Sequence, residues 1–76
     1  MRCSRLVDAL ESLGISAVRG KSGKHYTIEH PQIDELAGNF DGGHARDSEI
    51  KPHYVRAMRK LIEKYQEQIT YHLESR

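Results

Sequence analysis

A glycine-bounded turn, an alternating run and a closing proline set the strongest limit on the fold of this chain. The stretch runs from Gly20 to Pro31 and reads GKSGKHYTIEHP. Gly20 and Gly23 can adopt backbone angles that other residues avoid, and the side chains after them are expected to alternate between two faces, as in a strand. Because Pro31 has no N–H to donate to a sheet, the strand ends there. The stretch predicts a tight turn followed by a strand.

Two further strands are expected around this one. The short β-branched run at residues 15–19 precedes the turn, so residues 15–19 and 24–29 form a hairpin with a loop of about four residues. Residues 32–35 read as a polar connection anchored by Ile33. Residues 36–41 read as the third strand, and the glycine pair that follows them ends it.

Helical spacing of apolar residues predicts a helix before the hairpin. Leucines recur at this spacing over residues 4–13. Ser4 suits the N-cap, where a hydroxyl accepts a bond from a free backbone N–H. Gly14 suits the left-handed position that ends many helices. The stripe of leucines is expected to pack into the core.

A long C-terminal helix is predicted over residues 52–73. Pro52 fits the first turn of a helix, where its missing N–H has no cost, and no later Gly or Pro interrupts the heptad spacing of the apolar residues. A helix of about 22 residues is roughly 33 Å long, whereas a strand of six residues spans about 20 Å. The last turns should therefore extend beyond the sheet, and a homodimer or another partner would cover them.

The order of elements gives a single α+β domain over residues 1–76, with a three-stranded antiparallel sheet between the two helices in sequence. With so few strands, both helices must pack on one face of the sheet and leave the other face open. Tyr26 and Ile28 are expected to face the helices. His25, Thr27 and Glu29 are expected on the open face. This α-β-β-β-α layout resembles a double-stranded-RNA-binding domain (dsRBD-like).

Composition fits a small domain without a membrane segment or disulfide. Hydrophobic residues make up 37% of the chain and charged residues 30%, and no stretch approaches the roughly 20 apolar residues that span a bilayer. The N-terminus enters a charged amphipathic segment directly, so no signal peptide is expected. Cys3 is the only cysteine, which excludes an internal disulfide and fits a cytoplasmic location.

Charge is distributed unevenly along the chain. The formal net charge is +1, but residues 1–25 sum to +3, residues 26–50 to −5 and residues 51–76 to +3. The two ends can therefore form a basic face while the middle forms an acidic one. RNA is a plausible partner for the basic face, although a dedicated nucleic-acid binder usually has a stronger basic bias.

His25 is expected to face a phosphate backbone, since it is the first residue after a turn that carries two lysines. An imidazole has an ordinary pKa near 6.5, so it can give up or take a proton near neutral pH. Lys21, Lys24 and Arg19 lie close in sequence and supply positive charge for a phosphate backbone. The alternative is a surface histidine of a strand, without a function.

Among the other candidates, His44 and Arg46 can add an acid or a phosphate contact from the loop after the third strand. No pair of histidines has the i, i+4 helical spacing of a zinc site, so neither a metal nor another cofactor is expected.

These motifs together resemble the HicA (YcfA-like) toxins of bacterial type II toxin–antitoxin systems. The resemblance rests on GKHYTIEHP after a glycine turn, on a later histidine and on IKPxxVxxM at the start of the last helix, and it covers residues 4–66. The family carries Ser where this chain has Lys24. The resemblance implies a dsRBD-like fold, mRNA cleavage, a catalytic role for His25 and neutralisation by a HicB-type antitoxin.

Two functions of different classes remain open at this point. The first is a metal-independent mRNA interferase with His25 as general acid or base. The second is a non-catalytic dsRBD-like module that binds RNA or a protein partner, such as a toxin homologue that has lost its activity.

Overall fold

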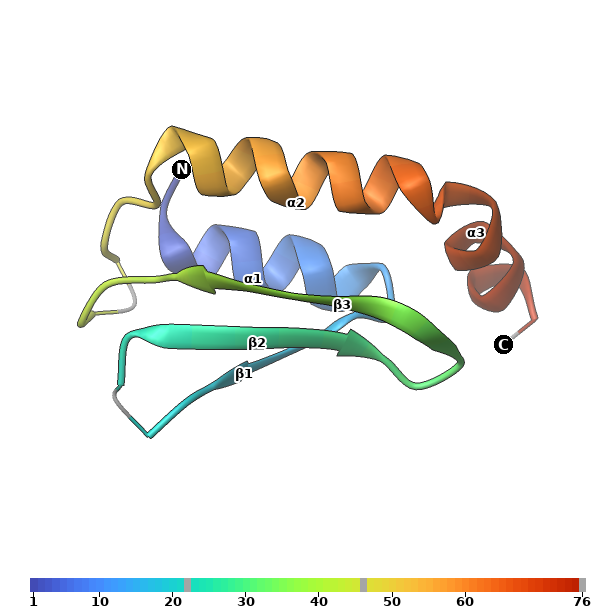
Figure 1. The fold of residues 1–76 in the computed structure, drawn as a ribbon, viewed down its shortest axis with the longest axis horizontal. Coiled ribbons are helices and arrows are strands. Elements are labelled where there is room, and N and C mark those ends of the chain that lie inside the picture. The colour runs from blue at the N-terminus through green and yellow to red at the C-terminus, as the bar shows by residue number, and fades with distance from the viewer. Residues whose placement is uncertain (22, 46, 76) are drawn as a thin grey trace.

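Three antiparallel strands form a meander in the order β1-β2-β3, and helices cover one of its faces (Figure 1). The computed structural model describes residues 1–21, 23–45 and 47–75. The predicted α+β class is confirmed, and so is the antiparallel sheet. The elements are α1 (Cys3–Ser12), β1 (Ser16–Arg19), β2 (His25–His30), β3 (Ile33–Asp41), α2 (Pro52–Lys64) and α3 (Gln66–Glu74).

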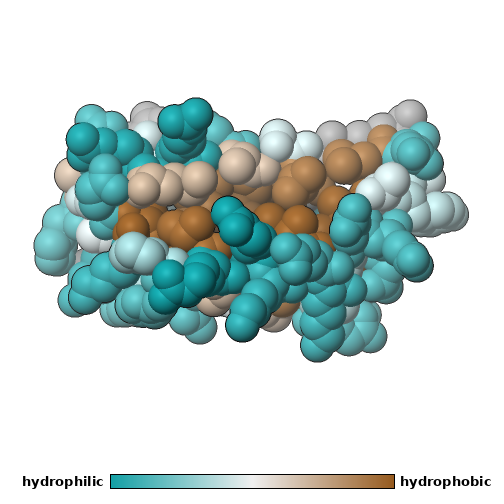
Figure 2. Space-filling view, turned by 90° about the horizontal axis from the view of Figure 1, so that it is seen from above, coloured by the Kyte–Doolittle hydropathy of each residue, from teal (hydrophilic) through white to brown (hydrophobic). Residues whose placement is uncertain are grey.

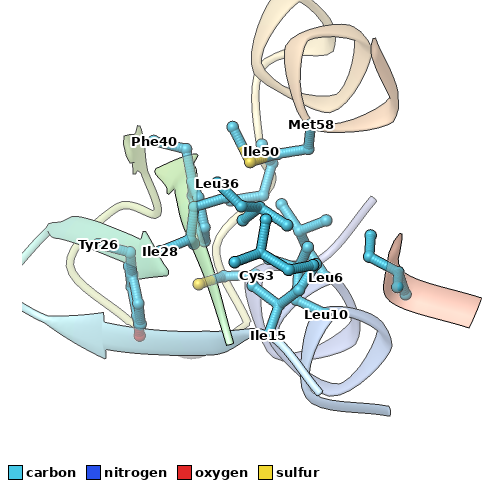
Figure 3. Packing of buried hydrophobic residues seen from close by; sticks show 12 residues of the cluster. Cys3, Leu6, Leu10, Ile15, Tyr26, Ile28, Leu36, Phe40, Ile50 and Met58 are labelled. Carbon is cyan, nitrogen blue, oxygen red and sulfur yellow. The ribbon is translucent and has the colours of Figure 1, made fainter. Parts of the chain in front are cut away.

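The predicted division of β2 into two faces is confirmed. Tyr26 and Ile28 are buried, whereas His25, Thr27 and Glu29 are exposed. The rings of Tyr26 and Phe40 stack with their centroids 5.0 Å apart, which joins β2 to β3 across the core. Figure 3 shows the core side chains gathered between the sheet and helices α1 and α2, with the Tyr26 ring ending over β1 in this view. The core further contains Leu6, Leu10, Ile15, Ile33, Leu36, Ile50, Met58 and Ile69.

The start of α1 is fixed by a distant segment and not by a side-chain cap. Arg2 is the N-cap residue, without a capping side-chain bond, so the prediction of Ser4 as the cap is wrong. The N–H of Cys3 instead donates to the carbonyl of Ser48 at 2.8 Å. The terminal ammonium lies 3.0 Å from a carboxylate oxygen of Glu49. Gly14 has a φ of 83°, as expected for the left-handed position after the helix.

Strand β3 begins three residues earlier than predicted, at Ile33. Only Pro31 and Gln32 separate it from β2, so the expected polar connection over residues 32–35 is wrong. Ile33 and Leu36 are both buried although they are three positions apart. In a regular strand, residues three apart face opposite sides, so this spacing does not show the alternation by which a strand is recognised in a sequence. A register shift between Glu29 and His30 of β2 accommodates the extra residues as a bulge.

The predicted single helix over residues 52–73 is two helices that meet at Tyr65. Its backbone, with φ −109° and ψ 19°, leaves the helical region, and α3 then turns toward the end of the sheet (Figure 1). The Tyr65 hydroxyl donates to the carbonyl of Glu35 in β3 at 3.2 Å. The break therefore coincides with a contact between this residue and the sheet.

Helix α3 covers the end of the core. Ile69 is only 2% exposed. The ring of His72 lies 5.4 Å from that of buried His30, whose Nδ1 accepts a bond from the N–H of Gln32. The argument for a homodimer assumed a straight helix extending beyond the sheet, and that assumption is wrong. The exposed apolar side chain in α3 is Tyr71, which is 65% exposed.

Helix α2 has fewer buried residues than α1. Met58 is its buried residue, while Val55, Leu61 and Ile62 are partly buried. Seen from above, hydrophobic residues form a band along the long axis, with hydrophilic residues on either side (Figure 2). No helix in the described part of the chain is long and apolar enough to cross a membrane.

We predict that Ile69→Ala lowers the free energy of unfolding by about 2–4 kcal/mol, because it removes a buried side chain from the α3 contact. Tyr71→Ala is the matched control in the same helix, and we expect a change within about 0.5 kcal/mol because that side chain is exposed. Urea unfolding followed by circular dichroism measures both. Equal losses for the two variants would contradict the placement of α3 against the core.

Candidate functional site

His25 stands at the first position of β2, on the face of the sheet that no helix covers. The same end of the molecule holds the β1–β2 turn, the end of β3 and the start of α2 (Figure 1). Its imidazole is exposed. A long polymer such as RNA can therefore reach the ring without a change in the fold.

The turn before His25 is closed by backbone hydrogen bonds. The N–H of Gly20 donates to the carbonyl of His25 at 2.7 Å, and the N–H of Gly23 donates to the carbonyl of Gly20 at 3.0 Å. Gly23 has a φ of 83°, a conformation that a side chain disfavours. These bonds fix the main chain of His25 relative to Lys21, which is exposed, and Lys24, which is half-buried.

Asp41 lies directly across the sheet from His25, as its partner in the β2–β3 register. The N–H of Gly43 donates to Oδ1 of Asp41 at 2.9 Å. This bond lowers the pKa of the Asp41 carboxyl below its ordinary value, and the positive charges of Lys24, His25 and Lys51 lower the pKa further. The carboxylate is therefore ionised at neutral pH and surrounded by cationic or titratable groups.

Gly42 makes this corner of the sheet compact. Its N–H donates to the carbonyl of Lys24 at 2.7 Å. A Cβ at this position would lie 2.6 Å from the ring of Tyr26 and 2.7 Å from Sγ of Cys3. The main chain of β3 therefore passes Tyr26 and Cys3 at a distance that only glycine permits.

The structure brings some predicted site residues together and separates others. Lys24 directly precedes His25 in the chain, and the charges of both lower the pKa of the Asp41 carboxyl. Arg19 is paired with Tyr26 and places its guanidinium 5.8 Å from that ring, on the face opposite His25. His44 is exposed in the loop after β3. Arg46 lies outside the described residues.

Sequence reasoning missed two residues of the site, Asp41 and Lys51. In the sequence, Asp41 is one acidic residue of the segment 26–50 that sums to −5. The pairing of the two strands indicates Asp41, because His25 begins β2 and Asp41 ends β3. In an antiparallel pair these two positions lie at the same end of the sheet. Lys51 precedes α2 and is distant in sequence, so no local pattern indicates it.

The uncovered face of the sheet is weakly acidic. The cross-strand register places eight residues on this face: Ser16, Val18, His25, Thr27, Glu29, Ala37, Asn39 and Asp41. Two of them are carboxylates, and none is Lys or Arg. The charges of Lys24 and Lys51 act on Asp41 at one end of the sheet, so a phosphate would be attracted to that end and not to its centre.

The chemistry that this site offers is proton transfer beside positive charge. His25 is a candidate base or acid, Lys24 and Lys51 are candidate contacts for a phosphate, and Asp41 adds a fixed negative charge. Within residues 1–21, 23–45 and 47–75, no group of three or more His, Cys, Asp or Glu side chains is arranged to hold a metal ion.

Comparisons of this chain with protein-family models, with curated proteins and with solved structures find no match. The fold is that of a small α+β domain with a three-stranded meander.

We predict that Gly42→Ala destabilises the protein by about 1–3 kcal/mol, because the new methyl group would overlap Tyr26 and Cys3. Gly38→Ala is the matched control within β3 itself, where a Cβ would meet Leu61 at an ordinary 3.4 Å. Thermal unfolding compares the two variants. A melting temperature for Gly42→Ala equal to that of the Gly38 variant would show that the corner is not closely packed.

Proposed function

We propose that this protein is a toxin-like endoribonuclease that cleaves mRNA without a metal ion, with His25 as the general acid or base. One observation carries the proposal: an exposed imidazole stands on the uncovered sheet face, at the end of the sheet where the charges of Lys24 and Lys51 act on its cross-strand partner Asp41. The motif resemblance to HicA toxins supports the same role for His25. An enzyme of this kind acts in the cytoplasm, where mRNA is found.

The reaction uses the 2′-hydroxyl of the RNA as its nucleophile. His25 takes the 2′-hydroxyl proton, the 2′ oxygen bonds to the adjacent phosphorus, and the bond from phosphorus to the 5′ oxygen breaks. Lys24 and Lys51 stabilise the additional negative charge on the phosphate, and Lys21 contacts the backbone from the turn. The leaving 5′ oxygen takes a proton from an acid, for which exposed His44 is the candidate. The products carry a 2′,3′-cyclic phosphate and a 5′-hydroxyl.

The resemblance implies a HicB-type antitoxin as the protein partner. The uncovered face, with its exposed Thr27 and Asn39, is accessible to such a partner as well as to RNA. Neutralisation of toxicity by the product of a neighbouring short reading frame would support this assignment.

We predict that His25→Ala reduces RNA cleavage by about 10²–10⁴-fold, because the variant lacks the group that transfers the proton. His53→Ala is the matched control, since it removes an exposed histidine from α2. Cleavage of a labelled RNA in excess chelator, with analysis of the ends, measures both variants. We expect cyclic phosphate ends from the wild type and from His53→Ala alone.

Two results would contradict the proposal. One is that His25→Ala still cleaves RNA, and the other is that the wild type stops cleaving RNA when the chelator is added. The same variant should restore growth of cells that express the protein. Circular dichroism of His25→Ala checks that the fold is retained, and we expect it to be because the side chain is exposed.

A second candidate function is a binding module without catalysis, and the charge of the uncovered face favours it. With Glu29 and Asp41 but no Lys or Arg on that face, a basic protein surface is a better electrostatic match for the centre of the sheet than RNA is. This function predicts intact RNA after incubation with the wild type. Any RNA binding through the sheet end would weaken steeply with salt.

A further inference from the structure

An apolar groove lies where the N-terminus of the chain meets the start of α2, on the side of the molecule that carries the helices (Figure 1). Its volume is about 500 Å³, and its apolar lining comes from Met1, Ile50, Pro52 and Val55. Ile50 is 3% exposed, whereas Met1 is 48% exposed. Ligand pockets of proteins usually measure about 300–1,000 Å³. This α2 groove is therefore large enough to take the apolar side chains of a ligand.

The α2 groove is already formed without a ligand. The N–H of Ile50 donates to the carbonyl of Met1 at 2.8 Å, which joins the two walls of the groove through the backbone. The carboxylate of Glu49 lies 3.0 Å from the terminal ammonium and 3.3 Å from Nε of Arg2. A ligand therefore does not have to order this part of the chain, and the entropic cost of binding is smaller.

Positive charge surrounds the apolar lining. Lys51 and Arg56 lie at the edge of the α2 groove and are exposed, and in the described part of the chain neither of them forms an ion pair. The carboxylate at this edge, Glu49, is by contrast already paired with cations. The charge continues along the helix, since residues 51–64 carry five cations and one carboxylate, a formal charge of +4. The groove thus offers unpaired cations to its ligand.

We infer that the α2 groove binds an acidic segment of another protein, with a large apolar side chain on Ile50 and Val55 and carboxylates against Lys51 and Arg56. RNA is a weaker match, because its phosphates suit the cations but it has no aliphatic group for the apolar lining. The inference does not rest on the proposed function, because binding in this groove requires no cleavage of RNA.

The apolar lining and the cations have different roles in such a contact. A few buried apolar side chains usually supply most of the affinity of an interface. Charges at its edge mainly accelerate association and disfavour partners of the wrong charge. Val55 is therefore expected to determine how tightly the segment binds, and Arg56 to determine which segments bind.

The test begins with a library of random peptides displayed on phage and selected on the wild-type protein at low salt. We expect enrichment of peptides in which Asp and Glu flank Leu, Ile or Phe. An enriched peptide is then synthesised with a fluorescent label and titrated with the protein and its variants. Binding should weaken as salt is added, because the cations are exposed.

Two variants change the α2 groove in different ways. Val55→Gln makes one wall polar, and Arg56→Glu reverses a charge at the edge. Lys64→Glu is the matched control, since it makes the same change of charge at an exposed position at the other end of α2, outside the groove. We expect Val55→Gln and Arg56→Glu each to weaken binding about tenfold or more, and Lys64→Glu to stay within about threefold of the wild type.

Circular dichroism checks the fold of each variant. Arg56 is exposed, so Arg56→Glu keeps the inference testable if Val55→Gln does not fold. A selection that enriches no acidic peptides, or equal binding by wild type and Arg56→Glu, would overturn the inference.

Other ligands for the α2 groove are tested with the same variants. Phosphatidylglycerol vesicles or a labelled RNA that bind more tightly than the peptide, and that Val55→Gln releases, would show a lipid or RNA site instead. A wild-type dimer in sedimentation that Val55→Gln dissociates would show that a second copy of the chain fills the groove. Either result would refute the inference, whereas a monomer that binds the acidic peptide most tightly would support it.

Discussion

The close approach at Gly42 is the constraint on which the arrangement of the site depends. There the main chain of β3 passes the Tyr26 ring and the Cys3 thiol, with no room for a Cβ between them. This contact joins α1, β2 and β3 at one corner. It also fixes the end of β3, and with it the position of Asp41 opposite His25. A site made of exposed side chains thus depends on a buried glycine beneath it.

Local sequence patterns predicted those parts of the fold that local physics determines. The alternation of β2 identified Tyr26 and Ile28 as core residues, because one face of a strand must be covered. The start of β3 was missed because a bulge places Ile33 and Leu36 three positions apart on the same side. The break at Tyr65 was missed because it has no Gly or Pro and coincides with contacts to the sheet.

For the candidate site too, the sequence predicted the features set within one strand and missed those set by pairing between strands. Exposure of His25 followed from strand alternation and the one-sided packing of helices. The partner Asp41 depends on the register between strands, which a hairpin loop sets and single-strand periodicity does not. Arg19 was assigned to the site by its closeness in sequence, yet its register puts it beside Tyr26 on the other face. Residues that are close in sequence can therefore lie on opposite faces of the sheet, and residues far apart in sequence can lie side by side.

The contact between the N-terminus and the segment before α2 has a consequence for the order of folding. All three strands pair with neighbours in sequence, so every strand pairing of the meander lies within residues 16–41. The first turn of α1 has to wait, because Cys3 and Met1 bind the backbones of Ser48 and Ile50. Short loops close at less entropic cost than long ones. Emergence from the ribosome therefore favours a sheet that forms first and a first helix that is secured only after the sheet is complete.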